Sequence, residues 1–261
     1  MEFFSPKGSI VCKIWSNADT ILFIFAGASA EFALNKAVDW LYFTGKLPAD
    51  PLGRLFSTVT YAQMIVFSDL DKANKAIDKI TAIHAEVEAN RHAQIPNWAY
   101  RDVLFLLVDY SVRAFELLYR KLSSAEKEDI YNTFYRMGLR MNLKELPQNY
   151  QDWVSVREEH LLQDLEKSRF TIDLYKQYKK HLGLARFILL KEVQAQLVPR
   201  KVRKLLGLRK VSLLMLIVPL YKISRKLQLD QLVKSLILPT AYKPQIKALD
   251  IAANHNYSMK I

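Results

Sequence analysis

The sequence of 261 residues has a single cysteine, Cys12, and only seven glycines. One cysteine cannot form an internal disulfide, and a thiolate metal cluster needs several, so both are excluded and a reducing compartment is favoured. Few glycines imply few tight turns, and long helices joined by short loops fit this composition better than many strands do. No Pro/Gly/Ser-rich linker divides the chain, so we expect a single domain over residues 1–261.

The sequence also lacks a long apolar run. Its first residues, MEFFSPKGSIVCKIW, contain polar residues and a proline where a signal peptide needs an apolar stretch. The longest uncharged, mostly apolar stretch, residues 211–221, is too short to span a bilayer and is expected to be buried or interfacial. We therefore expect a cytoplasmic protein without a transmembrane helix, and peripheral membrane contact stays open.

Several standard catalytic motifs are missing from the sequence. It contains no phosphate-binding glycine loop, no GxSxG elbow, no HExxH, no EF-hand spacing and no paired-cysteine zinc pattern. The net charge is +12, and residues 167–261 hold 20 Lys/Arg against 4 Asp/Glu. Such a basic segment suits anionic lipid, nucleic acid or acidic ligand groups, or is simply a solvated surface. No nucleic-acid-binding module accompanies it, so we expect no nucleic-acid partner.

A second feature of the basic segment is its mixture with apolar residues. Residues 199–210 hold six cations interleaved with valine and leucine, and the apolar stretch from Val211 follows directly. This pattern can lie in a bilayer interface, or it can form C-terminal helices that close the core with their basic side in water.

Apolar residues recur at helical spacing along most of the chain, which predicts an all-α fold. Asp50-Pro51 is typical of an N-cap followed by proline at the first helical position, and Ser123 with Glu126 forms a capping-box pattern. The stretch VLFLLV is apolar on nearly all faces, so its helix is expected at the centre of a bundle. We predict helices over residues 18–43, 51–67, 69–88, 100–122, 124–142, 151–167, 171–183 and 185–198, further helices within 209–250, and a loose tail over 251–261.

His84 is the histidine whose position is most unusual. Ile77, Ile80, His84 and Val87 fall on one stripe of a predicted helix, because steps of three, four and seven residues return to nearly the same angle. An imidazole on an apolar stripe is either a core histidine satisfied by a buried carbonyl or a neutral ligand offered to a metal. In contrast, His160 follows two glutamates and is expected at a helix surface.

The preceding helix carries a second unusual residue, Arg54. Arg54 and Thr58 are four residues apart and therefore share a helix face. A guanidinium there needs an anion, which could be a carboxylate such as Asp50, a helix C-terminus, or the anionic edge of a cofactor with the Thr58 hydroxyl near the reacting centre. The sequence thus predicts a metal ligand and an anion ligand on consecutive helices.

At these positions the sequence resembles the family of MpaB-type oxygenases and latex-clearing proteins (rubber oxygenases). The resemblance is carried by DPLGRLFST at residues 50–58 and by IHAEV at residues 83–87, and it continues to the PRKVRKLLGL segment that ends at Leu208. These two motifs are moderately specific as a pair, and the likeness covers most of the chain.

The resemblance implies an all-α, globin-like core over about residues 8–208 with additional helices and a bound haem b. It implies His84 as the proximal ligand of the haem iron, and Arg54 and Thr58 as cofactor-binding and catalytic residues of the pocket. It also implies a haem-dependent oxygenase that uses dioxygen to cleave double bonds in an apolar, isoprenoid or lipid-like small molecule.

Three positions depart from the family pattern. Ser57 replaces a lysine that caps the distal iron face in the latex-clearing branch, Asn35 stands where many members have the histidine of an LHP motif, and Val108 aligns with another histidine. These departures leave proximal ligation unchanged and predict a distal site that is open or water-ligated. They also leave an alternative, a non-enzymatic protein that binds haem or another hydrophobic ligand.

Overall fold

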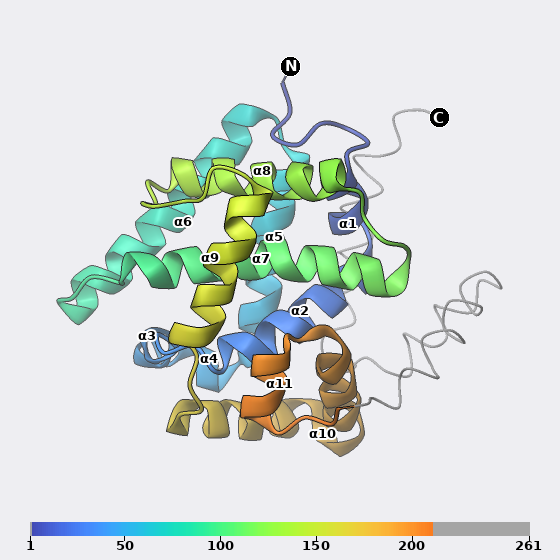
Figure 1. Ribbon diagram of the computed structural model, residues 1–261. Coiled ribbons are helices and arrows are strands. Elements are labelled where there is room, and N and C mark those ends of the chain that lie inside the picture. Colours follow the sequence, from blue (N-terminus) through green and yellow to red (C-terminus); the bar gives the residue numbers. More distant parts are fainter. Residues whose placement is uncertain (1, 211–261) are drawn as a thin grey trace.

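The computed structural model describes residues 2–210, and within them it contains helices and two isolated β-bridges but no strand. The all-α prediction is confirmed (Figure 1). The helices predicted within 209–250, the apolar stretch 211–221 and the tail 251–261 lie outside the described residues. The helices are α1 (Ile10–Trp15), α2 (Ala18–Phe32), α3 (Asp39–Phe43), α4 (Lys46–Ala49), α5 (Pro51–Phe67), α6 (Leu70–Arg91), α7 (Asn97–Leu118), α8 (Ser124–Arg140), α9 (Tyr150–Gln163), α10 (Arg169–Leu197) and α11 (Arg200–Leu206).

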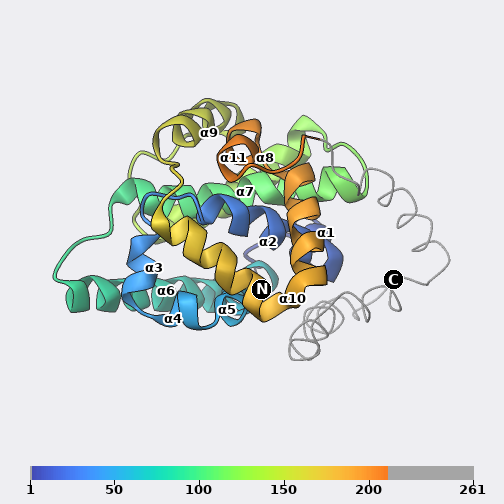
Figure 2. The same cartoon turned by 90° about the horizontal axis from the view of Figure 1, so that it is seen from below.

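Helix α7 runs through the centre of the described part of the chain (Figure 1). Helices α2 and α8 pack against it, and α10 packs against α2 at the base of the molecule, as the view from below shows (Figure 2). Most of α7 is buried, which agrees with its predicted central position. The main core gathers around large side chains that are essentially inaccessible to solvent, among them Trp15, Phe105, Tyr110 and Tyr131.

Two predicted helix starts are confirmed by their capping geometry. The Asp50 carboxylate accepts a hydrogen bond from the backbone N–H of Gly53 at 2.8 Å, and Pro51 is the first residue of α5. The Ser123 hydroxyl accepts from the N–H of Glu126, whose carboxylate accepts in turn from the N–H of Ser123, so the capping box is complete. Both caps satisfy backbone donors that the first helical turn leaves without partners.

The helical region predicted over residues 18–43 is confirmed at both ends but interrupted at residues 33–38, because α2 ends at Phe32 and α3 covers Asp39–Phe43. The chain turns there, and Asn35 forms an isolated bridge with Leu165. The side chain of Asn35 is buried; its amide nitrogen donates to Asp102 and its oxygen accepts from the N–H of Ala37 at 2.7 Å. These contacts give the backbone of residues 33–38 an alternative to helix, so tertiary structure overrides local periodicity here.

The predicted break between helices at residues 183–185 is confirmed. Gly183 has a φ of 74° and a ψ of 169°, which are not helical values, and this residue divides α10 into two helical halves that meet at a kink. This conformation is open to glycine and strained for other residues, which explains the change of direction. Within the described residues, no helix is long and apolar enough to cross a membrane.

Candidate functional site

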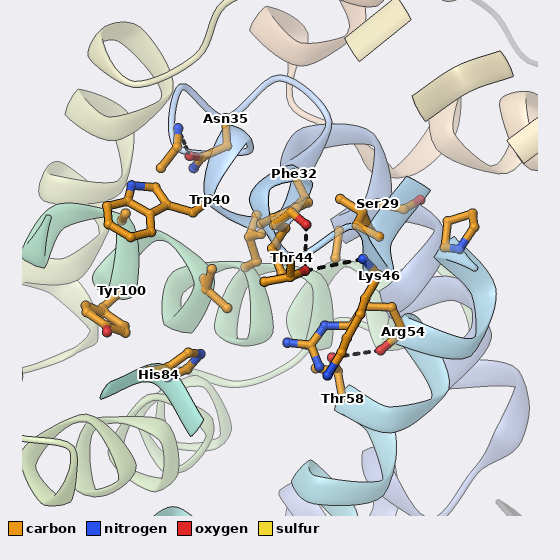
Figure 3. Close-up of a pocket in the computed structure, with 18 of the residues that line it drawn as sticks. Ser29, Phe32, Asn35, Trp40, Thr44, Lys46, Arg54, Thr58, His84 and Tyr100 are labelled. Carbon is orange, nitrogen blue, oxygen red and sulfur yellow. Dashed lines mark hydrogen bonds between the residues drawn. The ribbon is translucent and has the colours of Figure 1, made fainter. Parts of the chain in front are cut away.

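An apolar cavity lies between helices α2–α7 and the first half of α10 (Figure 3). Its volume is about 250 Å³. Five aromatic side chains contribute to its wall: Phe25, Phe32, Trp40, Tyr100 and Tyr178. A cavity of this kind, with few polar groups on an apolar wall, is the usual form of a binding site for an organic molecule.

Helix α6 presents His84 to this cavity, between Ile83 and Val87 of the same wall. The imidazole meets the ring of Tyr100 edge to face, with ring centroids 5.1 Å apart. Its Nδ1 is buried and has no hydrogen-bond partner among the described residues. Nδ1 thus lacks the buried carbonyl that a purely structural histidine would use, and Figure 3 shows the nitrogen-bearing edge of the ring turned toward the cavity.

The electrostatics around His84 favour the neutral imidazole. Burial lowers the pKa of His84, the positive charge of Arg54 lowers it further, and Glu88 opposes both effects. Glu88 also holds the adjoining wall together, because its Oε1 accepts from the Tyr100 hydroxyl at 3.1 Å and from the N–H of Ile95 at 2.8 Å. A neutral imidazole with a free lone pair is the form of histidine that binds a metal.

On the opposite side of the cavity lie Arg54, Thr58 and Lys46 (Figure 3). Burial lowers the pKa of the Arg54 guanidinium, whose Nη1 donates to the Ser57 hydroxyl at 3.4 Å. No carboxylate of the described residues lies within ion-pair distance of Arg54, so the carboxylate partner considered from the sequence is not found there. A half-buried guanidinium without such a partner is suited to bind an anionic group of a ligand.

The hydroxyls next to Arg54 are held by its backbone. The Thr58 hydroxyl donates to the carbonyl of Arg54 at 3.2 Å, and the Ser57 hydroxyl donates to the same carbonyl at 2.8 Å. Thr58 lines the cavity and Ser57 does not. Val108, the position aligned with a family histidine, is buried but does not line the cavity either.

The remaining wall residues could not be identified from the sequence. Lys46 and Trp40 come from the short helices α4 and α3, and Tyr178 comes from α10. No local pattern marks them, because the wall forms only when α10 packs against α2 and α4. Tyr100 lies near the start of the predicted central helix, and the family resemblance passes through it.

A buried network of charges lies on helices α2, α7 and α9. The Arg157 guanidinium donates to both carboxylate oxygens of Glu31 at 2.6 Å and to Asp109 at 3.0 Å. The Tyr110 hydroxyl donates to Glu31 at 2.8 Å. The carboxylates raise the pKa of Arg157 despite its burial, so the network contains a permanent cation between two carboxylates.

This network reaches the cavity through Asp102, whose carboxylate lies 3.9 Å from the Arg157 guanidinium and accepts a hydrogen bond from Asn35 on the cavity wall. Asp102 is fully buried, and burial together with the charge of Glu31 raises its pKa to about 7. His160 lies beside it, with Nδ1 at 4.0 Å from Asp102 and at 2.6 Å from Asp164. The prediction that His160 is at a helix surface is therefore wrong: its side chain is only 4% exposed, because α9 turns this face toward α7.

The described residues contain no group of three or more His, Cys, Asp or Glu that could hold a metal ion. His84 is a single imidazole on the cavity wall that could serve as one ligand. The two sides of the cavity combine such a ligand with cations for anionic groups and apolar surface for a flat organic ring.

The chain matches the family described as ER-bound oxygenase mpaB/B'/rubber oxygenase, catalytic domain, over residues 15–219. This range contains every residue that lines the cavity. Searches of curated proteins and of solved structures give no significant match.

Proposed function

The chain belongs to the family of ER-bound oxygenase mpaB/B'/rubber oxygenase catalytic domains, and from this premise we propose that it is an oxygenase that binds haem b beside His84. Its substrate would be an apolar, isoprenoid or lipid-like small molecule, and its co-substrate dioxygen. The observation that carries the proposal is the buried, unpartnered Nδ1 of His84 on the wall of an apolar cavity.

The residues present fit this cofactor. A haem iron is held by the porphyrin and needs one protein ligand on its proximal side, which a neutral His84 can supply. The two propionates need cations, and Arg54 and Lys46 line the wall opposite His84. Trp40 and the aliphatic wall residues offer apolar surface to the macrocycle. When bound, haem would supply the redox-active iron that activates dioxygen.

The chain's own residues would perform three tasks. Arg54 would neutralise a propionate, and its backbone carbonyl fixes the Thr58 hydroxyl at the cavity wall. Ser57 would offer no amine to a haem iron, and its hydroxyl donates to the Arg54 carbonyl, so the side chain at this position would not compete with dioxygen or water. The apolar wall would bind the substrate and exclude bulk water from the reaction.

The absorption spectrum of the haem-reconstituted protein tests His84. We expect the wild-type protein to show a Soret band typical of histidine ligation, and His84→Ala to shift or lose this band and to weaken haem binding at least tenfold. His92→Asn is the matched control, because His92 ends the same helix outside the cavity and asparagine tolerates its positive φ. An unchanged Soret band in His84→Ala would exclude His84 as the ligand, and no haem binding by the wild type would exclude the cofactor.

The charge of Arg54 makes a second prediction. We expect Arg54→Met to lower the affinity for haem by roughly 10- to 100-fold, because a charge-assisted hydrogen bond contributes about 1.5–3 kcal/mol. Haem dimethyl ester has no ionised propionates, so its affinity should be the same for both proteins in fluorescence-quenching titrations. Equal losses for haem and for the ester would show that Arg54 supports the fold of the cavity rather than a propionate.

A second candidate function is a non-enzymatic protein that binds haem or another hydrophobic ligand in the same cavity. The composition of the cavity wall favours this function. No carboxylate is among the described residues of the wall, and the side chain of Asn35 donates a hydrogen bond to Asp102. A carboxylate base is therefore missing from this wall. Oxygen consumption by the haem-loaded protein with candidate apolar alkenes separates the two functions, since only the oxygenase would consume oxygen in a substrate-dependent way.

A further inference from the structure

The outer surface of α10 carries exposed lysines and exposed aliphatic side chains. Along this helix Ile172, Leu184 and Ile188 are 51%, 62% and 52% exposed. Three exposed lysines lie between the first and the second of these residues. We call this set the α10 stripe, and it consists of Ile172, Lys176, Lys179, Lys180, Leu184 and Ile188.

The stripe follows from the helical repeat and from the kink. Ile172, Lys176, Lys179 and Lys180 share one face of the first half of α10, because they are spaced by steps of three and four residues. Helix α10 bends at Gly183, and Leu184 and Ile188 follow directly, one turn apart. The two exposed aliphatic residues therefore stand at the bend, next to the end of the lysine row.

No acidic side chain of α10 neutralises the lysines of the stripe. Helix α10 contains two acidic residues, and both are engaged elsewhere: Asp173 accepts from the Tyr42 hydroxyl at 3.0 Å, and Glu192 lies 3.8 Å from Arg209. Among the described residues, none of the three lysines has an ion-pair partner. The surface is therefore basic, and it suits an anionic partner.

The charge of the α10 stripe also indicates which kind of partner binds to it. Residues 211–261 hold seven Lys/Arg against two Asp/Glu, so their net charge does not complement that of the stripe, and neither does the charge of the stripe of a second copy. A nucleic acid would use the lysines but leave the exposed leucine and isoleucine in water. An anionic bilayer uses both, because lysines reach the lipid phosphates while aliphatic side chains enter the interface.

We propose that the α10 stripe docks the protein onto the surface of an anionic lipid bilayer. Helix α10 also supplies Tyr178 to the cavity wall, so the docked helix would separate the bilayer from the cavity. An apolar substrate that partitions into the membrane would then be concentrated next to this wall. The docking rests on charge and exposure alone and stands whether or not the cavity binds haem.

Sedimentation of the full chain with lipid vesicles tests the docking. We expect binding to vesicles of phosphatidylcholine with 30% phosphatidylserine, little binding to pure phosphatidylcholine, and weaker binding as salt increases. The triple variant Lys176→Glu/Lys179→Glu/Lys180→Glu should bind at least 100-fold more weakly, since each lysine near an anionic surface contributes about fivefold. The double variant Leu184→Ser/Ile188→Ser should also bind more weakly, and its loss should persist at all salt concentrations.

The matched control changes three exposed lysines of α6, Lys72→Glu/Lys75→Glu/Lys79→Glu, which alters the net charge equally. Circular dichroism must show that every variant has the wild-type helix content and melting temperature. We expect the α6 variant to bind vesicles far better than the α10 variant. Equal losses in the two triple variants, wild-type binding by the α10 variant, or α10-dependent binding of single-stranded RNA without vesicle binding would each overturn the docking proposal.

Discussion

Replacing Arg157 with leucine is expected to destabilise the fold by about 3–5 kcal/mol, the cost typical of removing one partner from a buried ion pair. Arg157 is 4% exposed and Glu31 is completely buried. The substitution would leave the carboxylates of Glu31 and Asp109 in the core without the guanidinium that both accept from. Urea denaturation followed by circular dichroism measures this loss as a lower midpoint.

The control for this prediction is a solvent-exposed arginine with similar geometry. Arg140 also forms two hydrogen bonds with one carboxylate, that of Asp78, at 2.7 and 2.8 Å, but both side chains are about half exposed. Surface ion pairs contribute little because water solvates the separated charges, so Arg140→Leu should change the midpoint only slightly. Similar midpoints for the two variants would show that the buried network does not stabilise the fold.

The position of this network links stability to the cavity. Glu31 belongs to α2 and Asp109 to α7, and both helices contribute cavity wall residues. Arg157 of α9 therefore fixes two walls of the cavity relative to each other. We expect that partial loss of the network would first be seen as a loss of ligand affinity, before the helices unfold.

Local patterns predicted the helices well where the signal lies within one turn. The caps at Asp50 and Ser123 and the glycine at position 183 each act on their own neighbours, so the sequence suffices to place them. The central position of α7 was also predictable, because a helix that is apolar on all faces must be buried.

Long-range contacts explain what the sequence did not predict. The end of α2 depends on the contacts of Asn35 with Asp102 and Leu165, which are distant in the chain. The acidic neighbours of His160 predict a surface position, whereas Asp102 and Asp109, seven residues apart on one face of an apolar helix, indicate a buried polar network. That signal could have been read from the sequence.

In the candidate site, too, local patterns predict some residues and long-range packing determines the others. His84 and Arg54 lie on consecutive helices that pack against each other, so their periodicity was enough to predict two walls of one cavity. Lys46 and Tyr178 come from helices separated by more than a hundred residues of sequence. Their approach depends on packing, which no local pattern encodes. The globin-like arrangement implied by the family resemblance stays a prediction.

The second large effect is expected from Asp102, whose pKa is raised to about 7 in the folded protein. The unfolded chain binds this proton only near the ordinary aspartate pKa of about 4. Between about pH 4 and 7 the folded state therefore holds the proton more tightly, so Asp102 contributes stability that is fully present below pH 4 and is lost as the pH rises through 7. The contribution is on the order of 2–4 kcal/mol, since one pKa unit corresponds to about 1.4 kcal/mol.

His160 acts in the opposite direction, because burial lowers its pKa and the folded state disfavours its protonation. The pH dependence of the wild type therefore combines two opposed trends, and Asp102→Asn isolates one of them. Asparagine keeps an oxygen that accepts from Asn35 and carries no charge, so this variant should be more stable than the wild type above pH 7. Its advantage should shrink as the pH falls toward 4, in urea denaturation at a series of pH values.

Asp78→Asn is the control, and its stability should depend on pH in the opposite direction. Arg140 lowers the pKa of Asp78, so the stability that Asp78 contributes is lost at low pH. A difference between Asp102→Asn and the wild type that stays constant from pH 4 to 8 would mean that Asp102 is ionised throughout this range, held by Arg157 and Asn35.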